Sequence, residues 1–129
     1  MTGSSRIFPA LAVATVLTIT TSLPAHAAWG SRKKAAELAG AALYRDKGCA
    51  HCHGADGSGT RKAPPLKDIR KKKEWTPDKM THQILNGGRK MPPFADSLTD
   101  QEVAQVIAYL RAKHKPVPPP ASEAAAATE

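Results

Sequence analysis

The chain has 129 residues, which allows one small domain and excludes an assembly of several. It holds only two cysteines and 5% aromatic residues, so no dense disulfide framework can stabilise it. The formal net charge of +8 favours an acidic partner surface or an anionic membrane, although such charge also serves simply to keep a protein soluble.

The first segment has the pattern of an export signal. Arg6 provides a positive start, residues 10–19 are apolar apart from threonines, and Ala25 and Ala27 suit the −3 and −1 positions of a signal-peptidase site. We therefore expect residues 1–27 to be a cleaved signal peptide and the mature protein to be periplasmic, without a transmembrane span. An uncleaved N-terminal anchor is the alternative. Export also argues against nucleic acid as the partner of the basic runs.

Residues 28–115 are expected to form the domain, and residues 116–129 a flexible tail rich in proline and alanine. A domain of this size is too small to rely on an apolar core alone and usually needs a disulfide, a metal or a cofactor. No alternating β-branched run follows Ala28, which argues against a sheet. The sequence instead predicts an all-α fold with three main helices.

The first helix is predicted from about Ser31, which can cap its first amides, to Lys47, with Gly48 ending it. Its apolar residues repeat at the helical spacing of 3.6: Ala35, Leu38, Ala39, Ala42 and Leu43.

Two further helices follow, with loops predicted at 54–66 and 87–98. One is predicted from the capping residue Thr76 to Asn86, with the glycine pair at 87–88 ending it. The other begins at Thr99, which forms a capping box with Glu102, and ends before Pro116. Its apolar residues again have helical spacing: Val103, Val106, Ile107 and Leu110.

Cys49, Cys52 and His53 form a C-x-x-C-H motif, which is typical of c-type haem attachment. The two thiols lie on one turn, as the two vinyl groups of haem require, and His53 projects toward the iron. A thioredoxin-like redox pair would need a strand before the motif. A disulfide between the two cysteines would close too small a loop to stabilise much. A zinc site using His51, His53 or His82 would lack the usual second ligand pair.

Several further segments resemble the small monohaem class I cytochromes c of bacteria, over residues 36–112. Tyr44 precedes the motif, and residues 54–60 are similar to the family's glycine-rich turn. Residues 63–66 resemble its Gly-Pro-x-Leu segment, with alanine in place of the first glycine. Residues 87–94 are similar to the methionine loop, and 99–111 to the last helix. The resemblance implies the small cytochrome c fold around one covalent haem c; the basic segment 67–74 departs from the family.

The sixth iron ligand has three candidates among the mature residues: Met80, His82 and Met91. Met80 and His82 lie in the second predicted helix, where Met80 faces inward as a core residue would. Met91 lies in a loop between two glycines and two prolines, and such a loop can approach the iron on a fixed path. The residues and the resemblance both favour Met91 opposite His53, with His82 or an open position as alternatives.

The resemblance also implies supporting contacts. The Pro64 carbonyl is expected to accept a hydrogen bond from the other ring nitrogen of His53. Trp75 is a possible donor to a haem propionate, or else a packed core residue. Gly40 and Tyr44 are expected to meet the last helix, at Val106 and Tyr109, where the family crosses its terminal helices.

From these features we expect a monomeric carrier of single electrons between redox proteins with acidic docking surfaces, and not an enzyme. One alternative is a dedicated electron-transfer subunit of a larger periplasmic oxidoreductase, with the tail as a docking arm. A second is a small peroxidase or gas sensor with a labile Met91, which would need a distal His–Arg pair that is not apparent.

Overall fold

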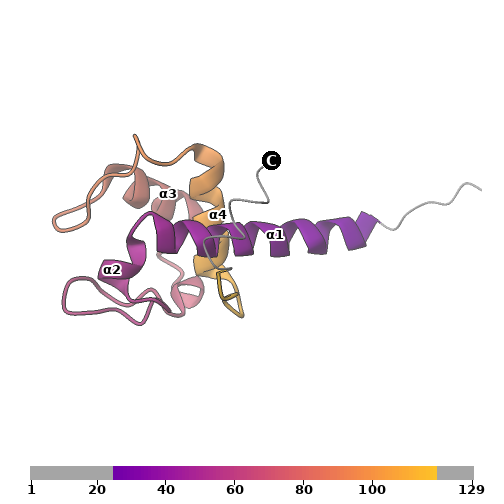
Figure 1. The fold of residues 1–129 in the computed structure, drawn as a ribbon, viewed down its shortest axis with the longest axis horizontal. Helices are drawn as coiled ribbons and strands as arrows, with labels where there is room; N and C mark the ends of the chain where they lie inside the picture. The colour runs from indigo at the N-terminus through magenta and orange to yellow at the C-terminus, as the bar shows by residue number, and fades with distance from the viewer. Residues whose placement is uncertain (1–24, 119–129) are drawn as a thin grey trace, which may run out of the picture.

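The computed structural model describes residues 25–118, so the predicted signal peptide and the predicted tail lie largely outside the described residues (Figure 1). The helices are α1 (Ala25–Asp46), α2 (Cys49–His53), α3 (Pro77–Asn86) and α4 (Asp100–Arg111), with a 3₁₀ helix η1 (Ile69–Lys71). Residues 25–118 contain no strand, which confirms the all-α fold. None of the described helices is both long and apolar enough to cross a bilayer.

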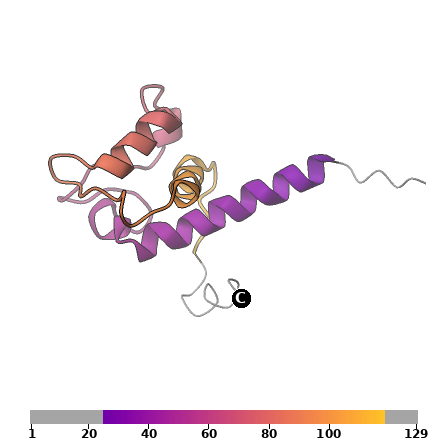
Figure 2. The same cartoon turned by 90° about the horizontal axis from the view of Figure 1, so that it is seen from above.

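Helices α1 and α4 cross and make the most extensive helix contact of the described part (Figure 2). Gly40 lies at the crossing, where a Cβ atom would overlap the backbone carbonyl of Gln105. The buried rings of Tyr44 and Tyr109 lie beside it, with centroids 5.3 Å apart and planes at 49°, a tilted pairing that aromatic rings favour. The expected meeting of the first and last helices is confirmed.

Helix α1 ends where the sequence predicts but begins earlier. Gly48 adopts a left-handed φ of 80°, and its N–H reaches the Arg45 carbonyl at 3.2 Å, so it closes the helix as expected. The predicted start at Ser31 was wrong, because the helix continues through Ser31 back to Ala25. Alanines at 25, 27 and 28 favour helix strongly enough to extend it. The amino-terminal half of α1 consequently extends beyond the body of the domain (Figure 2).

The predicted caps of the later helices are confirmed. The Thr76 hydroxyl accepts the Lys79 N–H at 3.3 Å. The Thr99 hydroxyl accepts the Glu102 N–H at 3.3 Å, while the Glu102 carboxylate accepts the Thr99 N–H at 2.7 Å. Helices α2 and η1 were not predicted as separate elements, because each is a single turn, too short for a periodic pattern.

Candidate functional site

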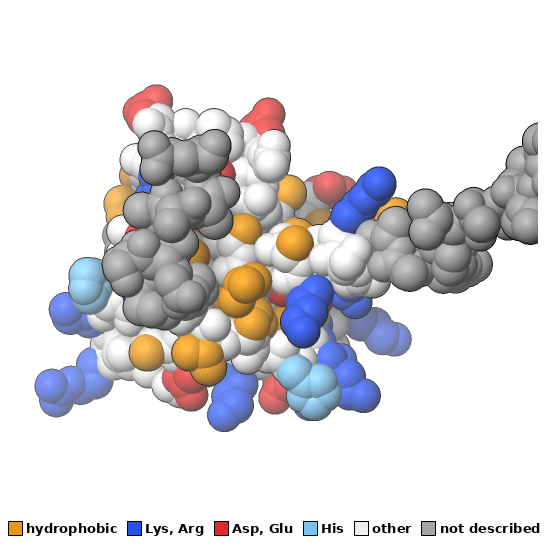
Figure 3. Space-filling view, turned by 45° about the vertical axis from the view of Figure 1, so that its right-hand side comes forward, with side chains coloured by type: hydrophobic (Ala, Val, Ile, Leu, Met, Phe, Trp, Pro, Cys, Tyr) orange, Lys and Arg blue, Asp and Glu red, His pale blue; other side chains and the backbone are white. Residues whose placement is uncertain are grey.

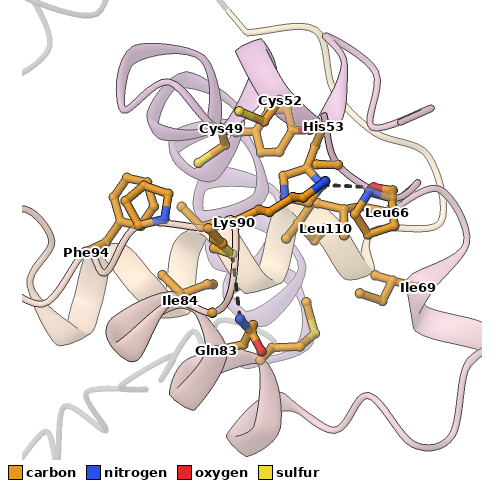
Figure 4. A pocket seen from close by; sticks show the side chains of 18 of the residues that line it. Cys49, Cys52, His53, Leu66, Ile69, Gln83, Ile84, Lys90, Phe94 and Leu110 are labelled. Atoms are coloured by element: carbon orange, nitrogen blue, oxygen red, sulfur yellow. Dashed lines mark hydrogen bonds between the residues drawn. The ribbon is translucent and has the colours of Figure 1, made fainter. Parts of the chain in front are cut away.

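A cavity of about 650 Å³ separates the α1–α4 pair from α3, η1 and the two long loops. This volume lies within the range of roughly 300–1,000 Å³ typical of ligand and cofactor sites. Apolar side chains make most of its wall and come from every element around it (Figure 4), among them Leu66, Ile69, Ile84, Phe94, Leu98, Val106 and Leu110.

Helix α2 brings both thiols to the wall of this cavity. Cys49 and Cys52 are three residues apart on one helical turn, and both are free thiols that line the cavity. Gly48 makes this arrangement possible, because its left-handed backbone turns the chain directly from α1 into α2. Burial raises the pKa of the Cys49 thiol, so this group is protonated near neutral pH. A half-buried thiol with a raised pKa is a weaker nucleophile at neutral pH than the low-pKa thiol of a redox-active pair.

His53 ends α2, and its ring is held from outside the helix. Its Nδ1 atom lies 2.9 Å from the Pro64 carbonyl oxygen. Since a carbonyl only accepts, Nδ1 carries the proton and donates, which leaves the lone pair of Nε2 available to a metal. The loop that supplies Pro64 is tied back to the motif: the Gly59 N–H donates to the His53 carbonyl at 2.7 Å, and the Thr60 hydroxyl to the Cys52 carbonyl at 2.6 Å.

Met91 lines the same cavity from the loop after α3. Gly87 begins this loop with φ of 68°, at a position where a Cβ atom would overlap the Met91 carbonyl oxygen. The Gly88 N–H donates to that oxygen at 2.8 Å, and the Phe94 N–H donates to the Ile84 carbonyl at 3.1 Å. The loop is therefore folded tightly onto the end of α3, which fixes the path of Met91 along the wall.

Gln83 is a site residue that the sequence analysis missed. Its Nε2 amide donates to the Gly87 carbonyl at 2.7 Å and approaches the Met91 sulfur at 3.9 Å (Figure 4). The sequence does contain a signal for it. Gln83 lies three residues after Met80 and one before Ile84, both of which are buried, so it is a polar side chain on the apolar face of α3.

The other candidate ligands of the sequence analysis lie elsewhere. Met80 is 3% exposed and packs in the core, although it also reaches the cavity wall. His82 and His51 are exposed and do not line the cavity. Within residues 25–118 no group of three or more His, Cys, Asp or Glu side chains is arranged to hold a metal ion. The described part thus offers no zinc site.

Trp75 lines the cavity beside η1, as a core or a haem-facing residue would. Its carbonyl accepts a hydrogen bond from Arg111 Nη1 at 2.9 Å, which ties the segment before α3 to the end of α4. The Lys79 ammonium lies 5.0 Å from the centre of its ring, a cation–π distance.

The charged side chains that line this cavity are all basic: Lys47, Lys62, Lys72, Arg89 and Lys90. A group with an apolar body and negatively charged substituents at its edge would match this combination of apolar wall and basic rim. A haem with its propionates has this chemistry. The cavity also offers an imidazole, from His53, and a thioether, from Met91, which are the usual iron donors of such haems. Its two thiols on one turn match covalent attachment, so the residues present fit this group.

Comparisons with known proteins find c-type cytochromes. The family model described as cytochrome C oxidase, cbb3-type, subunit III matches residues 35–110. The chain is 32% identical over 86 residues to the Cbb3-type cytochrome c oxidase subunit FixP of Sinorhizobium medicae, an alignment that covers 56% of this chain and only 28% of that relative.

Two further relatives are covered more fully. The cytochrome c6 of Thermosynechococcus vestitus is 32% identical over 78 residues, which cover 59% of this chain and 70% of that protein. The crystal structure of the c-type cytochrome XoxG from Methylobacterium extorquens AM1 superposes with a TM-score of 0.55 at 25% identity. That similarity covers 72% of this chain and 65% of XoxG.

Proposed function

Because the chain belongs to the class I c-type cytochrome family, whose members bind haem c covalently, we propose that it carries single electrons between redox partners through a haem held by His53 and Met91. The observation that carries this proposal is the composition of one cavity. His53 and Met91 come to it from separate elements, and the thiols of Cys49 and Cys52 flank His53 on α2. The two thiols are proposed to form the two thioether bonds.

The haem iron supplies the one-electron couple, and the side chains around it set its properties. The hydrogen bond from His53 to Pro64 fixes the imidazole ring and raises the basicity of the ligating nitrogen. The soft thioether of Met91 favours Fe(II), and the apolar wall destabilises the extra charge of Fe(III), so both raise the potential. With His53 and Met91 both holding the iron, no coordination position would be left for a substrate, which supports a carrier rather than an enzyme.

We propose that the carrier works in the periplasm and docks with acidic partners around the cavity. Lys62, Lys72 and Lys90 are exposed at the rim, and Lys72 belongs to the basic segment 67–74. Cations in this position would steer an acidic partner toward the haem edge and allow fast, weak docking.

The comparisons favour one alternative, a dedicated electron-transfer subunit of a larger periplasmic oxidoreductase. The matching family model is described as an oxidase subunit, and the chain is similar to part of FixP. Purification from the producing cell at moderate salt separates the two proposals. A free carrier elutes alone, whereas a subunit elutes in a stable complex with larger chains.

The ligand assignment is tested by Met91→Ala, with Met80→Leu as the matched methionine control. Met91→Ala should keep covalent haem but become high-spin, bind carbon monoxide and have a lower potential, because one axial ligand is lost. Met80→Leu should remain low-spin and inert to carbon monoxide, since Met80 packs in the core. A native-like, low-spin spectrum in Met91→Ala would show that another side chain is the ligand, and His82→Ala would then be tested.

A further inference from the structure

Exposed apolar side chains lie on α1 and on the segment that follows α4. Three large hydrophobic residues are exposed in the described part of the chain: Trp29 (75%), Leu38 (40%) and Val117 (85%). The first two lie on α1, and Val117 lies in the segment that follows α4. Trp29 has the largest apolar surface of any side chain, and burying it elsewhere would be favourable by a large margin. Contact with a partner would bury that apolar surface.

Basic side chains lie near two of these residues, because Gly30 and Pro116, the sequence neighbours of Trp29 and Val117, line a second hollow together with them. This hollow, of about 330 Å³, lies between α1 and the segment after α4. Four basic side chains line it, Lys33, Lys34, Lys113 and His114, against one carboxylate, Glu37, which lies 4.0 Å from Lys33. Figure 3 shows Lys, Arg and His side chains gathered beside the part of α1 that adjoins the grey residues.

We propose that this end of the molecule docks on the surface of a bilayer that contains anionic lipids. We call it the basic end surface and define it by Trp29, Lys33, Lys34, Lys113, His114 and Val117. This goes beyond the electron-carrying function, which involves the other end of the domain.

A lipid surface suits this arrangement better than a protein does. The centre of a protein interface is depleted of charge and packs its apolar groups together. Here Trp29 and Val117 are exposed, and each adjoins in sequence a residue, Gly30 or Pro116, of the hollow that the basic side chains line. Tryptophan beside lysine and arginine is the combination found where proteins meet lipid headgroups, since the ring enters the interface and the ammonium groups reach the phosphates.

Docking by this surface leaves the cavity accessible. Trp29 and Asp46 are separated by 17 residues of one helix, which corresponds to roughly 25 Å along its axis. The thiols and His53 follow at the far end of α1, in α2. A molecule held by its basic end surface would thus keep the rim of the cavity free for a redox partner while being confined to the membrane surface.

The proposal is tested with the haem-loaded protein as recovered from the producing cell. Binding is measured by co-sedimentation with vesicles of phosphatidylcholine alone and of phosphatidylcholine with phosphatidylglycerol. The chain has two tryptophans, and Trp75 lines the haem cavity, where energy transfer to haem quenches it. The remaining emission reports mainly on Trp29. Phosphatidylglycerol should bind the protein and shift this emission to the blue, and half-molar salt should reverse both effects.

Two matched double variants each remove two positive charges, one from the basic end surface and the other from the basic segment near η1. Lys33→Gln with Lys34→Gln should weaken binding to the anionic vesicles roughly 30-fold, from about 1 kcal/mol per cation near the surface. Lys67→Gln with Lys73→Gln alters the net charge equally at the basic segment near η1 and should leave binding within about twofold. Trp29→Ala should abolish the blue shift and weaken binding.

Three results would overturn the proposal. Wild-type protein that fails to bind vesicles containing phosphatidylglycerol at low salt would show that no such docking exists. Equal losses in the two double variants would mean that net charge alone matters. Binding that persists in salt and in Lys33→Gln/Lys34→Gln would be carried by another segment, such as the apolar residues 10–19.

Discussion

The two sides of the haem cavity are stabilised in different ways. On one side α1 and α4 pack directly, with Gly40 against the Gln105 carbonyl and Tyr44 against Tyr109. On the other side α3 packs Met80 and Ile84 into the same core, whereas the two loops are held mainly by hydrogen bonds within their own segments, such as Gly88 N–H to the Met91 carbonyl. Both sides line the cavity, but α1 and α4 also pack directly against each other, so the loop side should depend more on what fills the cavity.

Besides that shared core, side-chain hydrogen bonds connect the two sides. The Tyr44 hydroxyl donates to the Gly54 carbonyl at 2.9 Å, Lys47 Nζ to the Ser97 carbonyl at 2.8 Å, and Arg111 Nη1 to the Trp75 carbonyl at 2.9 Å. Hydrogen bonds of this kind contribute about 1 kcal/mol each, which is small beside the apolar area that a buried cofactor would cover. The comparison therefore predicts that haem stabilises the loop side more than the helix pair.

The strongest test removes the covalent attachment. Cys49→Ala with Cys52→Ala should abolish covalent haem, detected by haem staining of denaturing gels. The domain should fold poorly, because the cavity wall loses the group it packs against. Hydrogen exchange should show the greater loss of protection in α3 and residues 87–98 than at the α1–α4 crossing. A double variant that unfolds cooperatively with undiminished stability would refute a role for haem in the core.

The next test breaks the helix pair instead. Gly40→Ala places a Cβ atom on the Gln105 carbonyl, so it should lower the free energy of unfolding by about 1–3 kcal/mol in urea titrations. Gly30→Ala is the matched control, because it lies in the same helix with nothing within 4 Å of the new atom. It should be neutral or stabilising by about 0.5–1 kcal/mol. If both changes have the same effect, close approach is not what Gly40 provides.

Much of the helix pair could be predicted from the sequence, since its signals are local. The capping box of Thr99 and Glu102 lies within four residues, and Gly48 ends α1 by its own backbone preference. The start of α1 was missed for a related reason. Ser31 is a good cap in isolation, but the alanines before it favour continuing the helix.

The site was only partly accessible from sequence. The spacing of Cys49, Cys52 and His53 alone indicates the haem-attachment motif. The contact between His53 and Pro64 was expected only from the family resemblance, because no local sequence rule brings together two residues 11 positions apart across a loop. Gln83 was missed since helix periodicity assigns a face but not a hydrogen-bond partner. Ligation of iron by His53 and Met91 stays a prediction, to be tested by Met91→Ala.

A smaller effect is expected on the loop side from Gln83→Leu. The Gln83 amide points at the Met91 sulfur, and an N–H near a ligating sulfur draws electron density from it and favours Fe(II). A contribution of about 0.5–1 kcal/mol would correspond to a potential lower by roughly 20–40 mV. Potentiometric titration measures this, with Gln101→Leu on the exposed surface of α4 as the control. An unchanged potential in Gln83→Leu would mean that Gln83 only holds Gly87.

The smallest effect is expected at the start of α4, where neither Thr99 nor Glu102 lines the cavity. Hydrogen bonds from the Thr99 N–H and hydroxyl lower the pKa of the Glu102 carboxyl below its ordinary value. A group with a depressed folded-state pKa stabilises the fold above its unfolded pKa and loses that contribution as the pH falls through the folded value. Wild-type urea midpoints should therefore fall as the pH drops below about 5, and Glu102→Gln should flatten that dependence.

The haem spectrum should stay unchanged in this variant, because the capping box supports the helix pair without touching the wall that holds Met91. A spectral change would show that the two sides are coupled more tightly than their contacts suggest.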